Sequence, residues 1–166
     1  SRGLGDVYKR QVITKVGTGG VIDLYNGWAA ADLIVDVTGY YPAGSAYNPL
    51  VPSRVLDTRP GSEPAAKSTT KLVVAGKGGV PATGVAAVVL NVTAVNPVGP
   101  GFVTVYPAGV ARPTASNLNY VKGDVVPAMV IATVGSGGAI DLYTLDQTDL
   151  VVDLSLIHIS EPTRPL

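Results

Sequence analysis

The stretch AAVVLNVTAVNPVGPGFVTVYP, residues 86–107, decides the fold class of this chain. In its first half, valine and leucine alternate with Asn91 and Thr93, which is the period of a β-strand with one buried face. The Pro- and Gly-rich NPVGPG (96–101) then leads into FVTVY (102–106), a second run of β-prone residues. The spacing predicts two neighbouring strands joined by a hairpin-type loop.

Residues 47–153 continue this pattern and predict an all-β domain. Gly and Pro together make up 33 of the 166 residues and separate runs rich in Val, Ile, Thr and Tyr, while apolar patterns of helical period are absent. We therefore predict an antiparallel β-sandwich of immunoglobulin-like or jelly-roll kind. The predicted strands are 54–58, 71–75, 86–95, 102–106, 116–120, 126–134, 139–143 and 150–153, with GSGG (135–138) as a second hairpin-type loop.

An internal repeat divides the chain. VGTGGVIDLY (16–25) matches VGSGGAIDLY (134–143) at an offset of 118 residues, and DLIVD (32–36) matches DLVVD (149–153) at an offset of 117. A period of domain size predicts a row of whole modules rather than a solenoid. The boundaries that follow are 12–41 for the C-terminal strands of a preceding repeat, 42–46 for a linker, and 47–153 for a nearly complete repeat.

The two ends of the chain are related through the genetic code. Residues 1–11 and 154–164 can be encoded, in frame, by DNA strings that are reverse complements of each other over eleven codons. The string is similar to the adapter of transposase-based sequencing libraries, so we interpret 1–11 and 154–166 as adapter-derived. Residues 154–159 nevertheless have the β-propensity to replace the natural end of the last strand; alternatively, the orphan strands of 12–41 dock on the complete repeat.

Composition excludes several classes of function for residues 12–153. This segment holds eight basic and ten acidic residues, which is no basic footprint for nucleic acid. The single histidine is His158 and there is no cysteine, so Ser-His-Asp and Cys-His catalysis and Cys/His zinc sites are unavailable within it. No apolar run reaches the ~20 residues of a membrane helix. We expect a non-catalytic protein without cofactor, metal site, nucleic-acid partner or membrane insertion.

The stretch RVLDTR (54–59) carries the most concentrated side-chain chemistry. In a regular strand, Asp57 and Arg59 share one face and Arg54 lies on the other. The structural interpretation pairs Asp57 with Arg59 or Arg54 and thereby anchors the first strand of the repeat. The ligand-binding interpretation makes Arg54 and Arg59 a clamp, beside Asp57, for an acidic sugar or a wall phosphate.

The stretch SNLNY (116–120) supplies three further candidates, Asn117, Asn119 and Tyr120. Asparagine amides pair with sugar hydroxyls and tyrosine rings stack on sugar faces, although the same groups also satisfy backbone atoms at turns and strand ends.

The acidic residues near the end of the repeat predict a solvated face. Asp149 and Asp153 are four residues apart on a strand, about 13 Å along it, which does not converge as a calcium loop does. Asp141 and Asp146 belong to the same predicted face, and an inter-repeat calcium site is the alternative.

The order of several motifs adds a resemblance to a known family. PSRVLDTR (52–59), GVPATGVAAVVLNVTAVNP (79–97), GFVTVYPAG (101–109), RPTASNLNY (112–120) and IVDVTGYY (34–41) together resemble a repeat module of secreted and surface proteins of high-GC Gram-positive bacteria. There the module occurs in tandem or appended to secreted hydrolases. This copy departs from the pattern by ending before its final Gly-Tyr-Tyr.

The resemblance implies an extracellular or cell-surface location and no catalytic or ligand residues to carry over. The expected function is a structural or adhesive spacer or display module, with neighbouring repeats as partners and modules stacked end to end. The alternative is a carbohydrate or cell-wall binding module appended to a secreted hydrolase, with wall or extracellular polysaccharide as partner.

Overall fold

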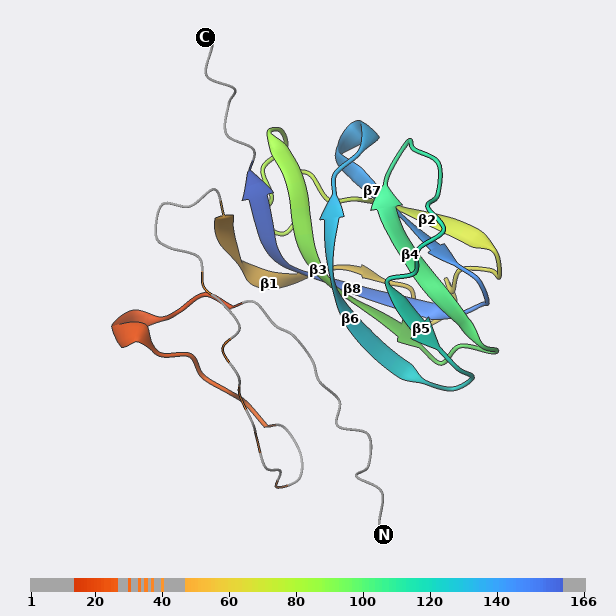
Figure 1. Cartoon of the computed structure of the whole chain (residues 1–166), viewed down its shortest axis with the longest axis horizontal. Coiled ribbons are helices and arrows are strands. Elements are labelled where there is room, and N and C mark those ends of the chain that lie inside the picture. The colour runs from red at the N-terminus through yellow and green to blue at the C-terminus, as the bar shows by residue number, and fades with distance from the viewer. Residues whose placement is uncertain are drawn as a thin grey trace.

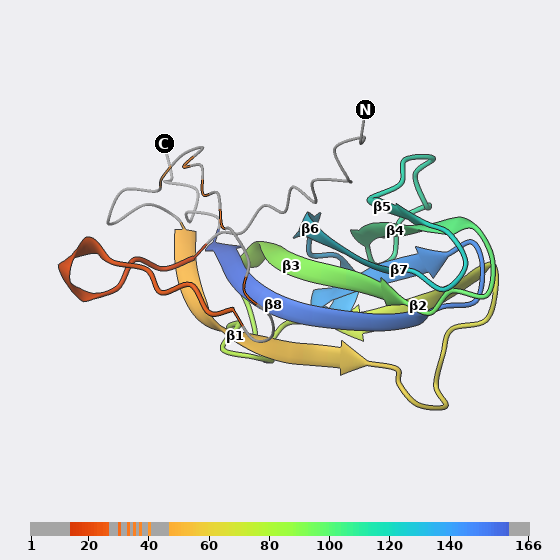
Figure 2. The same cartoon turned by 90° about the horizontal axis from the view of Figure 1, so that it is seen from below.

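The computed structural model describes residues 14–26, 30, 33, 35, 37, 40 and 47–159. Residues 47–159 form an all-β sandwich of two four-stranded antiparallel sheets, which Figures 1 and 2 show as two layers. The first sheet has the order β1-β8-β3-β6 and the second has the order β2-β7-β4-β5. The strands are β1 (Tyr47–Asp57), β2 (Ser68–Val73), β3 (Val85–Val95), β4 (Gly101–Pro107), β5 (Leu118–Tyr120), β6 (Val125–Thr133), β7 (Ala139–Thr144) and β8 (Asp149–Ile159).

The strand order is that of a jelly roll. The pairs β1·β8, β2·β7, β3·β6 and β4·β5 are all antiparallel and nest inside one another along the chain. Eight strands in two sheets of this kind are typical of a jelly roll. The immunoglobulin-like alternative is wrong, because that fold keeps its first two strands in one sheet, whereas here β1 and β2 lie in different sheets.

All eight predicted strands are confirmed, but the two predicted hairpin-type loops are wrong. NPVGPG (96–101) joins β3 to β4 and GSGG (135–138) joins β6 to β7, and each connection carries the chain from one sheet to the other. A loop rich in turn residues between two β-prone runs predicts that the chain reverses direction, but it does not predict whether the next strand joins the same sheet or the other one. Long-range pairing decides that choice in a sandwich.

The core lies between the sheets, and both contribute to it. Leu90 from β3 and Leu150 from β8 meet Ile140 and Leu142 from β7, all of them fully buried. The predicted alternation is confirmed, because Asp141 and the other odd-numbered residues of β7 are outside this cluster. Each buried leucine or isoleucine contributes roughly 1.5–3 kcal/mol relative to an exposed one.

The first and last strands are longer than predicted. β1 starts at Tyr47 and includes Pro49 and Pro52, which an edge strand tolerates because one row of its N–H groups has no partner strand. β8 continues past Asp153 to Ile159, and its backbone pairs with β1 on one side and β3 on the other. Residues 154–159 therefore complete the strand, the first of the two alternatives for this end, and Leu154 is fully buried.

The turn before β7 occurs a second time in the chain. Ser136–Gly138 and Thr18–Gly20 are both single 3-10 turns, with φ/ψ of 69°/21° at Gly137 and 74°/13° at Gly19. In each copy the glycine before the turn donates its N–H to the carbonyl four residues on, at 2.8 Å. The two turns, 118 residues apart in the chain, therefore share one backbone geometry.

The described residues of 12–41 contain this turn and no strand. Their large apolar side chains are exposed, as at Tyr25 (93%) and Val37 (87%), so docking on the sandwich is not seen for them. The predicted segments 1–11, 42–46 and 160–166 lie outside the described residues. None of the helices in the described part of the chain has the length and apolar character needed to cross a membrane.

Candidate functional site

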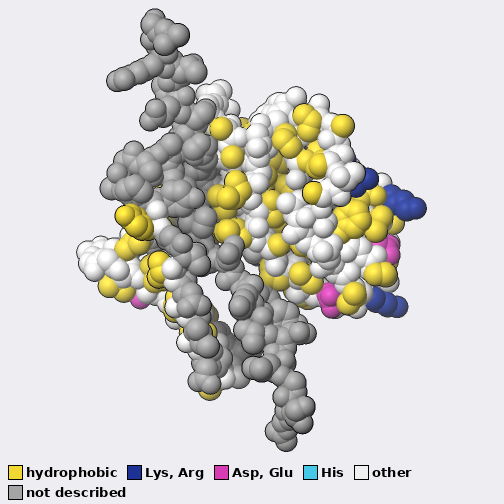
Figure 3. Space-filling view, in the orientation of Figure 1, with side chains coloured by type: hydrophobic (Ala, Val, Ile, Leu, Met, Phe, Trp, Pro, Cys, Tyr) yellow, Lys and Arg dark blue, Asp and Glu magenta, His cyan; other side chains and the backbone are white. Residues whose placement is uncertain are grey.

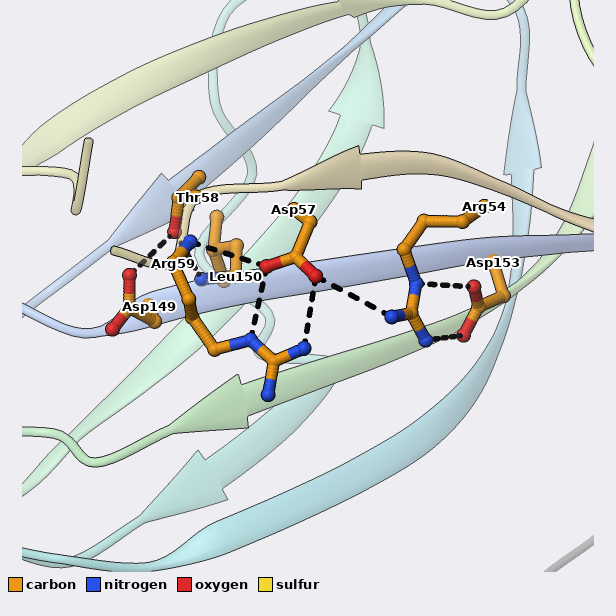
Figure 4. Close-up of polar contacts among 7 residues, drawn as sticks. All are labelled: Arg54, Asp57, Thr58, Arg59, Asp149, Leu150 and Asp153. Atoms are coloured by element: carbon orange, nitrogen blue, oxygen red, sulfur yellow. Dashed lines mark hydrogen bonds and ion pairs between the residues drawn. The ribbon is translucent and has the colours of Figure 1, made fainter. Parts of the chain in front are cut away.

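A β-bulge sets the geometry of the RVLDTR stretch. In the pairing of β1 with β8, Arg54 faces Asp153 and Leu56 faces Val152, so Val55 is an extra residue in β1. A bulge sends the residues after it to the opposite face from the one a regular strand gives them. The predicted opposite faces of Arg54 and Asp57 are therefore wrong, because the two side chains lie on one face and form an ion pair (Figure 4). The predicted pairing of Asp57 with Arg59 or Arg54 is confirmed for both arginines.

The charged side chains of this stretch form one arginine–aspartate network, made of Arg54, Asp57, Arg59 and Asp153 (Figure 4). Arg54 donates from Nε (2.9 Å) and Nη2 (3.3 Å) to the two carboxylate oxygens of Asp153, and from Nη1 to Asp57 (3.3 Å). Arg59 donates from Nε (2.9 Å) and Nη2 (2.8 Å) to the two oxygens of Asp57. The bidentate pair Arg54–Asp153 thus links edge strand β1 to β8, and the second bidentate pair, Arg59–Asp57, closes the end of β1 on itself. Bidentate geometry of this kind favours arginine over lysine.

Thr58 extends this link into the interior. Its hydroxyl donates to Asp149 Oδ1 (2.8 Å) and accepts from the Leu150 N–H (2.9 Å), while its own N–H donates to the Leu150 carbonyl (3.1 Å). The Thr58 side chain is buried and every polar atom named here has a partner. The end of β1 is therefore bound to the start of β8 by side chain and backbone together.

The hydrogen bonds of the network change the pKa values of two of its residues. The hydrogen bonds from Arg59 hold the pKa of Asp57 well below its usual range, and the hydrogen bond to Asp153 raises the pKa of Arg54. Both guanidinium groups already meet a carboxylate with two donors each. This pairing favours the anchoring interpretation over a clamp for an acidic ligand.

Acid should weaken this network in a defined direction. The Asp57 pKa is lowered on folding, so its contribution to stability is complete above the unfolded pKa of about 3.9 and is lost as the pH falls through the folded value. We expect the urea midpoint of the wild type to exceed that of Asp57→Asn at pH 6, and the difference to shrink steadily below about pH 4. A difference that is constant from pH 6 to pH 2 would contradict this assignment.

The SNLNY candidates are placed in three different roles. Asn117 Oδ1 accepts from the Val105 N–H at 2.7 Å. The Tyr120 hydroxyl donates to the Asp146 carbonyl (2.9 Å) and accepts from the Asp146 N–H (3.2 Å); Tyr120 is buried, and burial raises its pKa. Asn119, opposite Phe102 of β4, is exposed, and within the described residues it is the one candidate of the three whose side chain makes no hydrogen bond.

An aromatic cluster that the sequence did not single out lies on the outer face of the second sheet. The guanidinium carbon of Arg112 sits 4.0 Å above the ring centre of Tyr143, and the rings of Tyr143 and Phe102 are 6.0 Å apart. The alternation of β7 could have placed Tyr143 on this face. Arg112 lies in the connection between β4 and β5, and no local sequence pattern predicts that its side chain packs over Tyr143.

The predicted solvated acidic face is wrong at Asp141. Asp141 is only 9% exposed, and its Oδ1 atom is buried without a hydrogen-bond partner. In the sheet, Lys71 of β2 and Tyr106 of β4 are its register partners on the two sides. Among the described residues no three His, Cys, Asp or Glu side chains converge as metal ligands.

The surface itself is weakly charged. On the face in Figure 3, most of the charged side chains that can be seen lie at the right edge, and most of the remaining visible surface of the described residues is hydrophobic or uncharged. Comparison with protein-family models and with curated protein sequences gives no match.

Proposed function

We propose that the protein is a non-catalytic, extracellular β-sandwich repeat that acts as a structural or adhesive spacer or display module of a secreted or surface protein. Neighbouring repeats of the same chain are its partners. One observation carries the proposal: the candidate ligand groups Arg54, Asp57, Arg59, Asn117 and Tyr120 bond to one another or to the backbone. A residue set used in this way stabilises a fold and has few donors left for a ligand.

The sequence between the two ends supports the absence of catalysis. Residues 12–153 have no histidine and no cysteine, so a nucleophile would lack its usual base. The recurring turn supports the tandem arrangement, because a repeated module needs the same local geometry in each copy.

Carbohydrate or cell-wall binding is the second candidate, and the outer face of the second sheet favours it. Asn119 is exposed opposite Phe102, and Phe102 lies beside the stacked Arg112 and Tyr143. An amide beside an aromatic ring suits a sugar, whose hydroxyls need partners and whose C–H face stacks on rings. Arg112 already covers one face of Tyr143, which leaves Phe102 and Asn119 as the accessible part.

A binding screen separates the two candidates. We expect the full chain to show no saturable binding to purified peptidoglycan, a teichoic acid, or neutral and acidic extracellular polysaccharides, measured by calorimetry or co-sedimentation. Saturable binding that Phe102→Ala or Asn119→Ala abolishes and Asp57→Asn retains would overturn the spacer proposal in favour of a glycan-binding face. Binding that is lost in Arg59→Ala but retained in Asn119→Ala would instead favour the interpretation of Arg54 and Arg59 as a clamp for an acidic ligand.

A further inference from the structure

The two ends of the repeat lie at the same end of the sandwich. β1 and β8 are antiparallel neighbours, and Tyr47 at the start of β1 faces His158 at the end of β8. Figure 1 shows the start of β1 beside the arrowhead of β8. The direction of both strands is already fixed by the pair Arg54–Asp153, so it does not depend on residues 154–159.

This chain path does not produce the expected end-to-end stacking. In the preceding copy, residues 37–41 align with 154–158, and only residues 42–46 separate them from β1. Five residues span at most about 18 Å, whereas the 11 residues of β1 extend over roughly 36 Å. Successive repeats are therefore joined at one end of each sandwich. Tension along the chain enters and leaves each sandwich at that end and does not run along the length of the sandwich.

Tension on such a repeat pulls β1 and β8 apart at one end, which is the direction in which a strand pair resists force least. Hydrogen bonds between antiparallel strands run perpendicular to the strands. A force that separates Tyr47 from the end of β8 therefore stretches the outermost bond pair alone, and the pairs break in sequence. A force along the strands would instead load every pair at once.

The β1–β8 pair has a weak half and a strong half along this path. The outer half contains Pro49 and Pro52, which have no N–H to donate, and its register shifts between Pro49 and Ser53. The inner half holds the arginine–aspartate network and the Thr58 bonds to Asp149 and Leu150. Separation that starts at Tyr47 reaches the network last, when it arrives at the Arg54–Asp153 pair.

We propose that the arginine–aspartate network is a latch that resists tension in the tandem array, and that the repeat is an extensible link. The outer half of β1 separates first, the network then holds, and its rupture opens the sandwich. Ends that are one strand spacing apart when folded become separated by about 380 Å when the 113 residues of Tyr47–Ile159 extend. This inference rests on the proposed spacer function.

Single-molecule force spectroscopy on the full chain tests the latch. The chain has no cysteine, so handles can be attached at Ala46→Cys and Ser160→Cys, or at Ala46→Cys and Gln147→Cys as the control that shears β1 along β8. We expect a lower mean rupture force for 46/160 than for 46/147. Equal forces, or a higher force for 46/160, would overturn the unzipping geometry.

A matched pair of arginine variants tests the residues. Arg54→Ala should lower the main rupture force of the 46/160 protein, while Arg112→Ala, which removes an arginine from the second sheet, should leave it unchanged. Equal effects of the two variants would overturn the assignment of the latch. Glycan binding would overturn the spacer function without changing the order of these forces, so the two failures are distinguishable.

Discussion

Replacing Leu90 with alanine is expected to lower the free energy of unfolding by about 2–5 kcal/mol. Leu90 is fully buried in β3, a central strand that pairs with both β6 and β8. Its side chain belongs to the cluster between the sheets, so truncation leaves a cavity that neither sheet can fill without shifting the other. Urea denaturation followed by circular dichroism measures the loss.

Ile131→Ala is the matched control for this experiment. Ile131 lies on β6, opposite Val89 of β3, and is 63% exposed on the outer face of the same sheet. A surface truncation of this kind changes stability by roughly 0.5 kcal/mol or less. Equal losses for Leu90→Ala and Ile131→Ala would contradict the assignment of inner and outer faces, on which the sandwich depends.

Gly135→Ala is expected to have an effect of similar size for a different reason. A Cβ at this position would meet the backbone N and O of Ala108 and would lie 2.8 Å from the Pro107 carbonyl carbon. Backbone cannot rotate away as a flexible side chain can, so the turn and the end of β4 must separate. We expect a loss of about 3 kcal/mol or more, measured by urea denaturation.

Gly137→Ala separates this close contact from the general cost of removing a glycine. Gly137 has a φ of +69°, but a Cβ there meets nothing within 4 Å. The substitution should cost about 1 kcal/mol through backbone strain alone. A loss for Gly137→Ala as large as that for Gly135→Ala would show that the contact with Ala108 is not the cause.

The fold class and the strands were accessible from the sequence because they depend on local period and turn residues. Leu90 and Leu142 fall on the inner face as their alternation predicts. The pairing of the strands was not accessible, because β1 with β8 and β2 with β7 join segments far apart in the chain. Local pattern therefore left the jelly roll and the immunoglobulin-like order equally open.

The residue types of the arginine–aspartate network could be singled out from the sequence, but the bulge that sets their geometry could not. Arg54, Asp57 and Arg59 were singled out by their chemistry, but the bulge at Val55 that places all three together has no signal in RVLDTR. Asp141 was misplaced because its neighbours in the sheet, Lys71 of β2 and Tyr106 of β4, come from distant parts of the chain, which the pattern of its own strand does not reveal. Side-chain contacts between strands could not be predicted either, because they depend on which distant strands pair.

The measurement that tests the central claim most directly is the set of cross-strand nuclear Overhauser contacts between β1 and β8 in the full chain. The structure predicts backbone contacts for Arg54 with Asp153 and for Leu56 with Val152, and it leaves Val55 without a facing residue. That pattern would place the first and last strands side by side with the charged network across them. Contacts that pair Val55 with β8 in a regular ladder, or no β1–β8 contacts at all, would contradict it.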